Sequence, residues 1–182
     1  MTRELSWRDA VVDAASVPAN GWHFRLEAGE ADRIEIARRY DVPAVLSCAA
    51  SCVILPKDGA LAEVRIDLGV RLERRCVVTC EPMEEQIFEA FETTVLGADT
   101  FLTSDENAGD EDFEIALNGK IDLADLVVQH LAVAMTPYPR SADADTHLAE
   151  IMPQGKAAAE LKNPFADLAD RLYNSDSDPK AQ

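Results

Sequence analysis

Residues 62–73 alternate between apolar and mostly charged side chains without a break. The apolar set is Ala62, Val64, Ile66, Leu68, Val70 and Leu72, and the intervening set is Glu63, Arg65, Asp67, Gly69, Arg71 and Glu73. Successive side chains of a β-strand point to opposite faces, so this pattern predicts one long strand with one face in the core and the other in water. The parity continues through Gly69, so we expect at most a bend there, and not a turn between two strands.

Several neighbouring segments also favour strands. Residues 42–55 are rich in β-branched and small apolar residues, and residues 56–59, Pro-Lys-Asp-Gly, are typical of a turn. Residues 84–95 suit either a strand or a helix; we predict a strand, because Pro82 breaks the chain and the long strand needs a partner. A short strand is expected at 113–117.

Two helices are predicted within this region. The first covers residues 28–40, with an apolar stripe of Ile34, Ala37 and Tyr40, and should stop near Asp41 because the residue before Pro43 is pushed out of helical geometry. The second begins at Asp122, which has the character of an N-cap, with Asp125 placed to reach back to the helix start. Its predicted buried face consists of Leu123, Leu126, Val127, Leu131 and Ala134.

These elements predict an α+β fold: a mainly antiparallel sheet with long hairpin strands and two or three helices packed on it. We expect an N-terminal arm at 1–22, a core domain at 23–140, and a flexible linker with a short C-terminal helix at 141–182. The last helix should start at Asn163-Pro164, and the chain after it should be disordered. Residues 99–114 hold seven acids and no base, which is typical of a solvated loop.

The charge of the chain limits its partners. There are 34 acidic and 17 basic residues in 182, a formal net charge of −17. This surplus opposes non-specific binding to nucleic acid and favours basic partners. No export signal is recognisable near the N-terminus, and the longest uncharged run, 42–56, is too short to span a bilayer. We therefore expect a cytoplasmic protein with no membrane and no DNA partner.

The four cysteines are the clearest candidates for chemistry. They form two pairs, Cys48 with Cys52 and Cys76 with Cys80, each with three residues between the cysteines. Two pairs of thiols suggest a structural zinc site, but residues four apart on a strand are separated by about 13 Å, too far to share one metal. Only a turn at Cys76–Cys80 would bring such a pair together. Small buried thiols are the simpler interpretation, and a zinc-binding or redox module is the alternative.

No catalytic constellation is recognisable. His23, His130 and His147 are scattered, and His130 lies near the apolar face of the second helix. Asp110–Asp112 lack the glycine-punctuated pattern of a calcium loop. The small basic cluster Arg71, Arg74 and Arg75 is expected to pair with nearby acids. We assign no catalytic, cofactor-binding or metal-binding residue, and expect a protein that is not an enzyme and needs no cofactor.

Three blocks, in order along the chain, resemble one bacterial family. They are Cys76-Val77-Val78-Thr79-Cys80-Glu81-Pro82; Lys120-Ile121-Asp122-Leu123 continuing to Thr136-Pro137-Tyr138-Pro139-Arg140; and Asn163-Pro164-Phe165-Ala166-Asp167-Leu168. They are similar to motifs of the YceD family, also called the large ribosomal RNA subunit accumulation protein, in its alphaproteobacterial branch. The resemblance spans about residues 21–172.

The resemblance implies a role in the synthesis, processing or accumulation of large-subunit ribosomal RNA, that is, in ribosome biogenesis. Many members of the family carry two cysteines separated by two residues; here the separation is three, so no metal site is transferred. The family supplies no catalytic residues. Because the chain is acidic, the expected partner is a basic ribosomal protein or assembly factor of the large subunit, with only indirect association with ribosomal RNA.

Overall fold

The structure is a computed structural model that describes residues 2–98 and 113–152. The chain forms two compact units, Met1–Ser141 and Ala142–Gln182. The predicted acidic loop lies almost entirely outside the described residues, as do the predicted helix at Asn163 and the chain end. Among the described residues, no helix combines the length and apolar character needed to cross a membrane.

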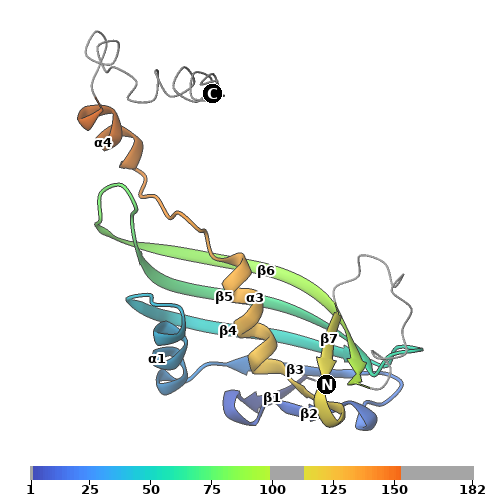
Figure 1. Cartoon of the computed structure of the whole chain (residues 1–182). Coiled ribbons are helices and arrows are strands. Elements are labelled where there is room, and N and C mark those ends of the chain that lie inside the picture. The colour runs from blue at the N-terminus through green and yellow to red at the C-terminus, as the bar shows by residue number, and fades with distance from the viewer. Residues whose placement is uncertain (1, 99–112, 153–182) are drawn as a thin grey trace, which may run out of the picture. The chain divides into compact units, whose positions relative to one another are not determined.

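The first unit is built on a six-stranded sheet in the order β1-β3-β4-β5-β6-β7. Its strands are β1 (Thr2–Ser6), β3 (Trp22–Glu27), β4 (Ala44–Leu55), β5 (Ala62–Arg75), β6 (Pro82–Gly97) and β7 (Phe113–Ala116). The four central strands run antiparallel, while β1 and β7 lie parallel to their neighbours at the two margins (Figure 1). The predicted α+β class and mainly antiparallel sheet are confirmed.

The alternating segment forms the single long strand that was predicted. β5 pairs with β6 in unbroken register from Ala62 to Arg75, and the pairing continues through Gly69. The Phe88 ring on β6 lies 3.6 Å from the position that a Cβ at Gly69 would occupy, so the aromatic side chain covers the glycine. The apolar residues of the alternation are all buried, which places this face of β5 in the core.

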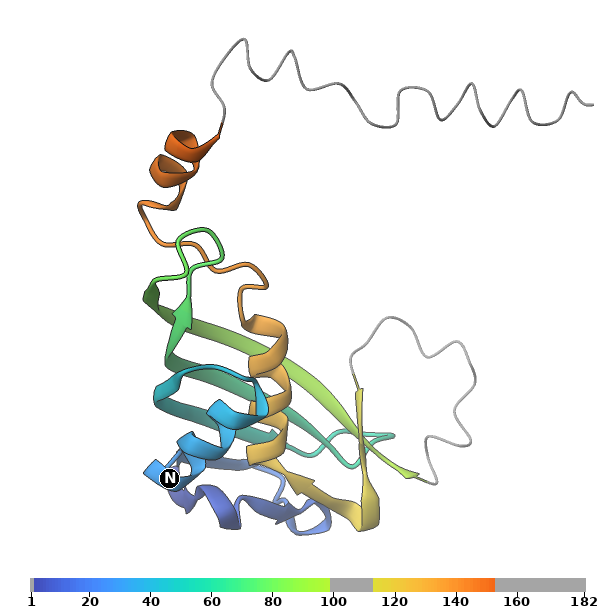
Figure 2. The same ribbon diagram turned by 60° about the vertical axis from the view of Figure 1, so that its left-hand side comes forward.

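Helices α1 (Glu30–Arg39) and α3 (Leu123–Ala134) pack on the same face of the sheet (Figure 1, Figure 2). α3 buries Leu123, Leu126, Val127 and Leu131, as predicted, and α1 buries Ile36 and Ala37. Ile34 was predicted to join the apolar stripe of α1, but it is exposed, because Ile36 faces the sheet instead. We call the opposite face of the sheet the outer face. Among the described residues of this unit, no helix packs on it.

Residues 1–22, predicted as an arm, contribute strands to the first unit. β1 pairs with β3, and β2 (Val11–Asp13) forms a two-stranded antiparallel sheet with β8 (Lys120–Asp122). Short 3-10 helices follow β1 (η1, Trp7–Asp9), β2 (η2, Ala14–Ser16) and β7 (η3, Leu117–Gly119). The amide of Leu123 donates to the carbonyl of Ala10 at 2.9 Å, so the start of α3 is attached to this N-terminal region.

The second unit contains a helix that was not predicted. Residues 144–151, expected to belong to a linker, form α4 (Ala144–Ile151), and the Met152 amide closes it onto the Leu148 carbonyl at 3.0 Å. The prediction rested on low aromatic content, which does not oppose a helix, since alanine, leucine and glutamate all have high helix propensity.

Candidate functional site

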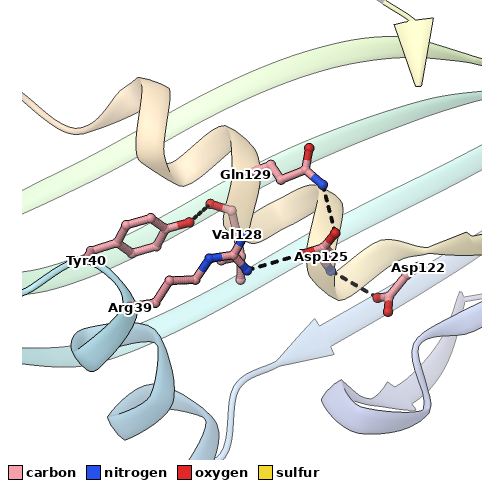
Figure 3. A network of polar contacts seen from close by, with 6 residues as sticks. All are labelled: Arg39, Tyr40, Asp122, Asp125, Val128 and Gln129. Atoms are coloured by element: carbon pink, nitrogen blue, oxygen red, sulfur yellow. Dashed lines mark hydrogen bonds and ion pairs between the residues drawn. The ribbon is translucent and has the colours of Figure 1, made fainter. Parts of the chain in front are cut away.

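A polar groove of about 220 Å³ lies between η1, α1 and the start of α3. Figure 3 shows its central network: Arg39 contacts Asp125 at 3.2 Å, and Gln129 donates to the other carboxylate oxygen of Asp125 at 2.8 Å. The Tyr40 hydroxyl donates to the Val128 carbonyl, and burial raises the pKa of Tyr40. The groove lining contains no serine, cysteine, histidine or lysine, and its polar groups hold α1 against α3.

The start of α3 corrects one detail of the sequence prediction. Asp122 is the N-cap, because its carboxylate accepts from the Asp125 amide at 3.0 Å (Figure 3). The Asp125 carboxylate does not reach back to the helix start. It is held by Arg39 and Gln129, because an ion pair to α1 and a bond one turn along its own helix are both within reach.

The second candidate site is at the tip of the β5–β6 hairpin. Residues 76–81, the cysteine turn, are closed by two bonds of 2.9 Å, from the Cys80 amide to the Cys76 carbonyl and from the Cys76 amide to the Glu81 carbonyl. Cys80 has a φ of 59°, in the left-handed region that non-glycine residues seldom occupy. The predicted turn is therefore present, and it brings the pair Cys76 and Cys80 close together.

Residues 136–141, the return segment, follow α3 and pack on the cysteine turn. The Val77 amide donates to the Pro139 carbonyl at 2.9 Å, and the Ser141 amide donates to Cys76 Sγ at 3.3 Å. The first two blocks of the family resemblance, far apart in the sequence, thus meet in space. Their residues serve one structural junction.

Two largely buried charges fix the start of the return segment. Arg74 and Glu85 form an ion pair at 2.8 Å, with side chains only 14% and 10% exposed. Arg74 also donates to the Thr136 carbonyl at 3.1 Å, and Glu85 accepts from the Thr136 amide at 2.9 Å. The pair therefore satisfies both backbone groups of Thr136, and we call this arrangement the Thr136 clamp.

The sequence predicts that Arg74 pairs with an acid, but it does not indicate that Thr136 is the third member of the clamp. A signal was present: continuing the alternation of β5 past Leu72 puts Arg74 on the core face, and Glu85 stands opposite Leu72 on the same face. A charge at an inward position needs a partner, so these two residues could have been singled out. The identity of Thr136 as the third member depends on where α3 ends.

Cys76 is the most unusual titratable group of the site. Its side chain is 1% exposed, and its sulfur accepts from the amides of Val78, Thr79 and Ser141 at 3.3–3.5 Å. The hydroxyls and amides of Ser141 and Thr79 lower the pKa of Cys76 to about 6, against the opposing effect of burial. Ser141 Oγ has no partner that meets hydrogen-bond geometry, so the amide donors are the firmer part of this stabilisation.

The other cysteines differ. Cys48 and Cys52 lie on the core face of β4, and burial raises the pKa of each to about 12. Cys80 is exposed, and all four thiols are free. The described residues contain no group of three or more His, Cys, Asp or Glu side chains arranged to hold a metal ion.

The histidines and the basic cluster named in the sequence analysis lie on several elements, where the contacts that they make stabilise the fold. His130 stacks on Phe91 with a centroid distance of 3.4 Å, at the boundary between α3 and β6. Arg71 pairs with Glu84 at 2.8 Å, as expected for the basic cluster, and Arg75 donates weakly to the Cys80 carbonyl at 3.4 Å. His23 is on the outer face of β3, away from His130, and His147 is on α4 in the second unit.

Comparison with known proteins adds no relative. The chain matches no protein-family model, and no curated protein or solved structure is significantly similar to it.

Proposed function

We propose that this chain is a non-enzymatic factor of ribosome biogenesis that supports the synthesis, processing or accumulation of large-subunit ribosomal RNA by binding a basic protein partner. The family resemblance supplies the process. The charge distribution of the chain supplies the type of partner.

The observation that carries the proposal is that many of the described arginines form ion pairs within the chain. Arginines on η1, α1, β5 and its end are held by carboxylates of the same chain, in the pairs Arg8–Asp32, Arg39–Asp125, Arg65–Glu92, Arg71–Glu84 and Arg74–Glu85. A chain of net charge −17 in which five of the described arginines already have carboxylate partners offers few free guanidinium groups for direct contact with phosphates. It is well suited to attract a positively charged polypeptide.

The junction of the cysteine turn and the return segment also supports the proposal. Residues of the first two blocks that resemble the YceD family contact each other through Val77 and Pro139, and Ser141, the residue after the second block, donates to Cys76 Sγ. Residues with such roles maintain a shape. A binding protein needs a fixed surface more than it needs a reactive group.

The test is an affinity pull-down from a bacterial lysate at moderate salt, with and without ribonuclease. We expect recovery of precursor large-subunit particles or of one basic large-subunit protein, and that protein should remain bound after ribonuclease treatment. Recovery should fall as salt is raised, because charge attraction is screened. Salt-resistant binding of the pure chain to isolated ribosomal RNA, or recovery of metabolic enzymes alone, contradicts the proposal.

A thiol-based regulatory module is the second candidate, favoured by one observation, the lowered pKa of Cys76. The near-complete burial of that sulfur opposes it, because a redox-active thiol must meet its reactant. Elemental analysis with a thiol count separates the two candidates: bound zinc, or a disulfide formed reversibly between Cys76 and Cys80, supports the module.

A further inference from the structure

β6 lies at the margin of the sheet for most of its length. β5 pairs with it from Pro82 to Val95, but β7 pairs with it only from Thr94 to Gly97 (Figure 1). Among the described residues, Pro82–Glu92 therefore has a strand neighbour on one side only. We call the other side the free edge. An edge strand presents unpaired amide and carbonyl groups that can pair with another strand.

The direction of these backbone groups follows from one hydrogen bond. The carbonyl of Val95 accepts from the Leu61 amide at 2.9 Å, so it points toward β5. Backbone groups alternate in direction along a strand, and the register with β5 has no shift, so Ile87 and Glu89 also point toward β5. The intervening residues Gln86, Phe88, Ala90 and Glu92 present their amides and carbonyls at the free edge.

The side chains of these intervening residues lie on the outer face of the sheet. Phe88 is 78% exposed although it covers Gly69, and Ala90 beside it is exposed as well. The middle of the free edge thus combines outward backbone groups with an apolar surface. Exposed acidic residues by themselves oppose edge-to-edge aggregation, whereas an exposed phenylalanine favours association with another chain.

The charge of β6 selects among the strands that could pair with it. The strand contains Glu84, Glu85, Glu89 and Glu92 and no basic residue. Arginines of β5 hold Glu84, Glu85 and Glu92, whereas no ion pair of Glu89 occurs among the described residues. A second copy of β6 would set glutamates against glutamates, and like charges across a strand pair are destabilising. The chain's own segment 99–112 holds six acids and no base, so it is equally unsuitable.

We propose that the free edge of β6 binds an extended basic segment of the partner protein as an added β-strand, centred on Phe88 and Ala90. An apolar residue of that segment would contact Phe88 on the outer face, and a lysine or arginine would face Glu89 on the other. The inference rests on the proposed function for the partner's identity. The binding mode follows from the edge itself.

The first test uses the full chain and a synthetic peptide of alternating lysine and valine, with amide hydrogen exchange read residue by residue. In the free protein, the amides of Gln86, Phe88 and Ala90 should exchange fast and those of Ile87 and Glu89 slowly. With saturating peptide, the three fast amides should become protected. A glutamate-valine peptide should not protect them. Absence of peptide binding, or protection confined to other parts of the chain, overturns the inference.

The second test removes one outward amide. Ala90→Pro deletes a donor that faces away from β5, so the ladder to β5 should survive, and peptide affinity should fall by roughly tenfold or more. Ala90→Thr keeps the donor and is the matched control, expected to bind as the natural chain does. Unchanged affinity in a folded Ala90→Pro variant overturns the inference; should that variant not fold, the exchange measurement decides it.

The same two variants separate this inference from the proposed function in the pull-down. If the natural chain and Ala90→Thr recover large-subunit material and Ala90→Pro does not, both stand. If Ala90→Pro recovers it equally, the edge is not the binding surface and the proposed function remains. If neither the natural chain nor either variant recovers large-subunit material, the proposed function is wrong. The peptide measurement still decides whether the edge accepts a basic strand.

Discussion

The pairs Cys48–Cys52 and Cys76–Cys80 have the same spacing in the sequence but opposite surroundings in the structure. The first pair lies on the core face of a strand, and burial raises the pKa of both thiols to about 12. The second pair brackets a turn, where hydroxyl and amide donors lower the pKa of Cys76 to about 6 and Cys80 is exposed. Spacing alone therefore does not determine thiol chemistry. The local backbone and the segment packed on it do.

The turn pair depends on a part of the chain that is distant in sequence, whereas the strand pair depends only on the core. Ser141 reaches Cys76 because the return segment is fixed at its start by the Thr136 clamp. The difference between the two pairs can be tested by substitutions in the clamp and in the cysteines, and by the reactivity of each thiol.

Breaking the clamp should have the largest effect. Arg74→Met leaves Glu85 without its cation in a largely buried position, and we expect a loss of about 3 kcal/mol in the free energy of unfolding, measured by urea denaturation. In the variant, Cys76 should also become easier to alkylate, because the return segment loses its anchor. Arg71→Met is the matched control: its pair with Glu84 is exposed, so stability should hardly change. Equal losses in the two variants would contradict the clamp.

Introducing a hydroxyl group into the strand pair should have the next largest effect on the free energy of unfolding. Cys52→Ser puts a hydroxyl into an apolar core position that is 1% exposed, which should cost about 2 kcal/mol of unfolding free energy in the same assay. Cys80→Ser makes the same chemical change at an exposed position and should leave stability unchanged. If Cys52→Ser proved neutral, the strand pair would not be packed in the core as described.

The sequence predicted the strand pair better than the turn pair. Alternation along β5 and the β-branched run of β4 are local signals, so the long strands, the buried thiols and the apolar face of α3 could all be predicted from them. The clamp and the contact between Cys76 and Ser141 join residues more than 50 positions apart, and no local periodicity reports such a contact. Asp125 shows the same limit, because its carboxylate is taken by Arg39 on another helix.

The turn pair should also make stability depend on pH. The pKa of Cys76 is about 6 in the folded chain against an ordinary value of 9.0, so the folded state holds the thiolate more favourably than the unfolded state. Its stabilising contribution is fully present above pH 9 and is lost as pH falls from 9 toward 6. The stability of the natural chain relative to Cys76→Ala should therefore rise between pH 6 and pH 9. A difference that stays constant over this range would show that the thiolate is not favoured.

The smallest expected effect is a difference in alkylation rate among the four thiols of the natural chain, and measuring it needs no substitution. Alkylation rate depends on both thiolate content and access of the reagent. Cys80 is exposed and should react first with iodoacetamide, whereas Cys76 should react slowly despite its lowered pKa, because its sulfur is almost fully covered. Cys48 and Cys52 combine burial with a raised pKa and should react only on unfolding.

Peptide mapping after timed alkylation gives these rates separately for each cysteine. Cys80 protected together with Cys76, and released by a chelator, would indicate that the two turn thiols share a metal. Fast alkylation of Cys76 in the native chain would show instead that the return segment opens. In that case Cys76 would combine a lowered pKa with access to solvent. The thiol-based regulatory module would then have a reactive thiol that its reactant can reach, which the closed turn does not provide.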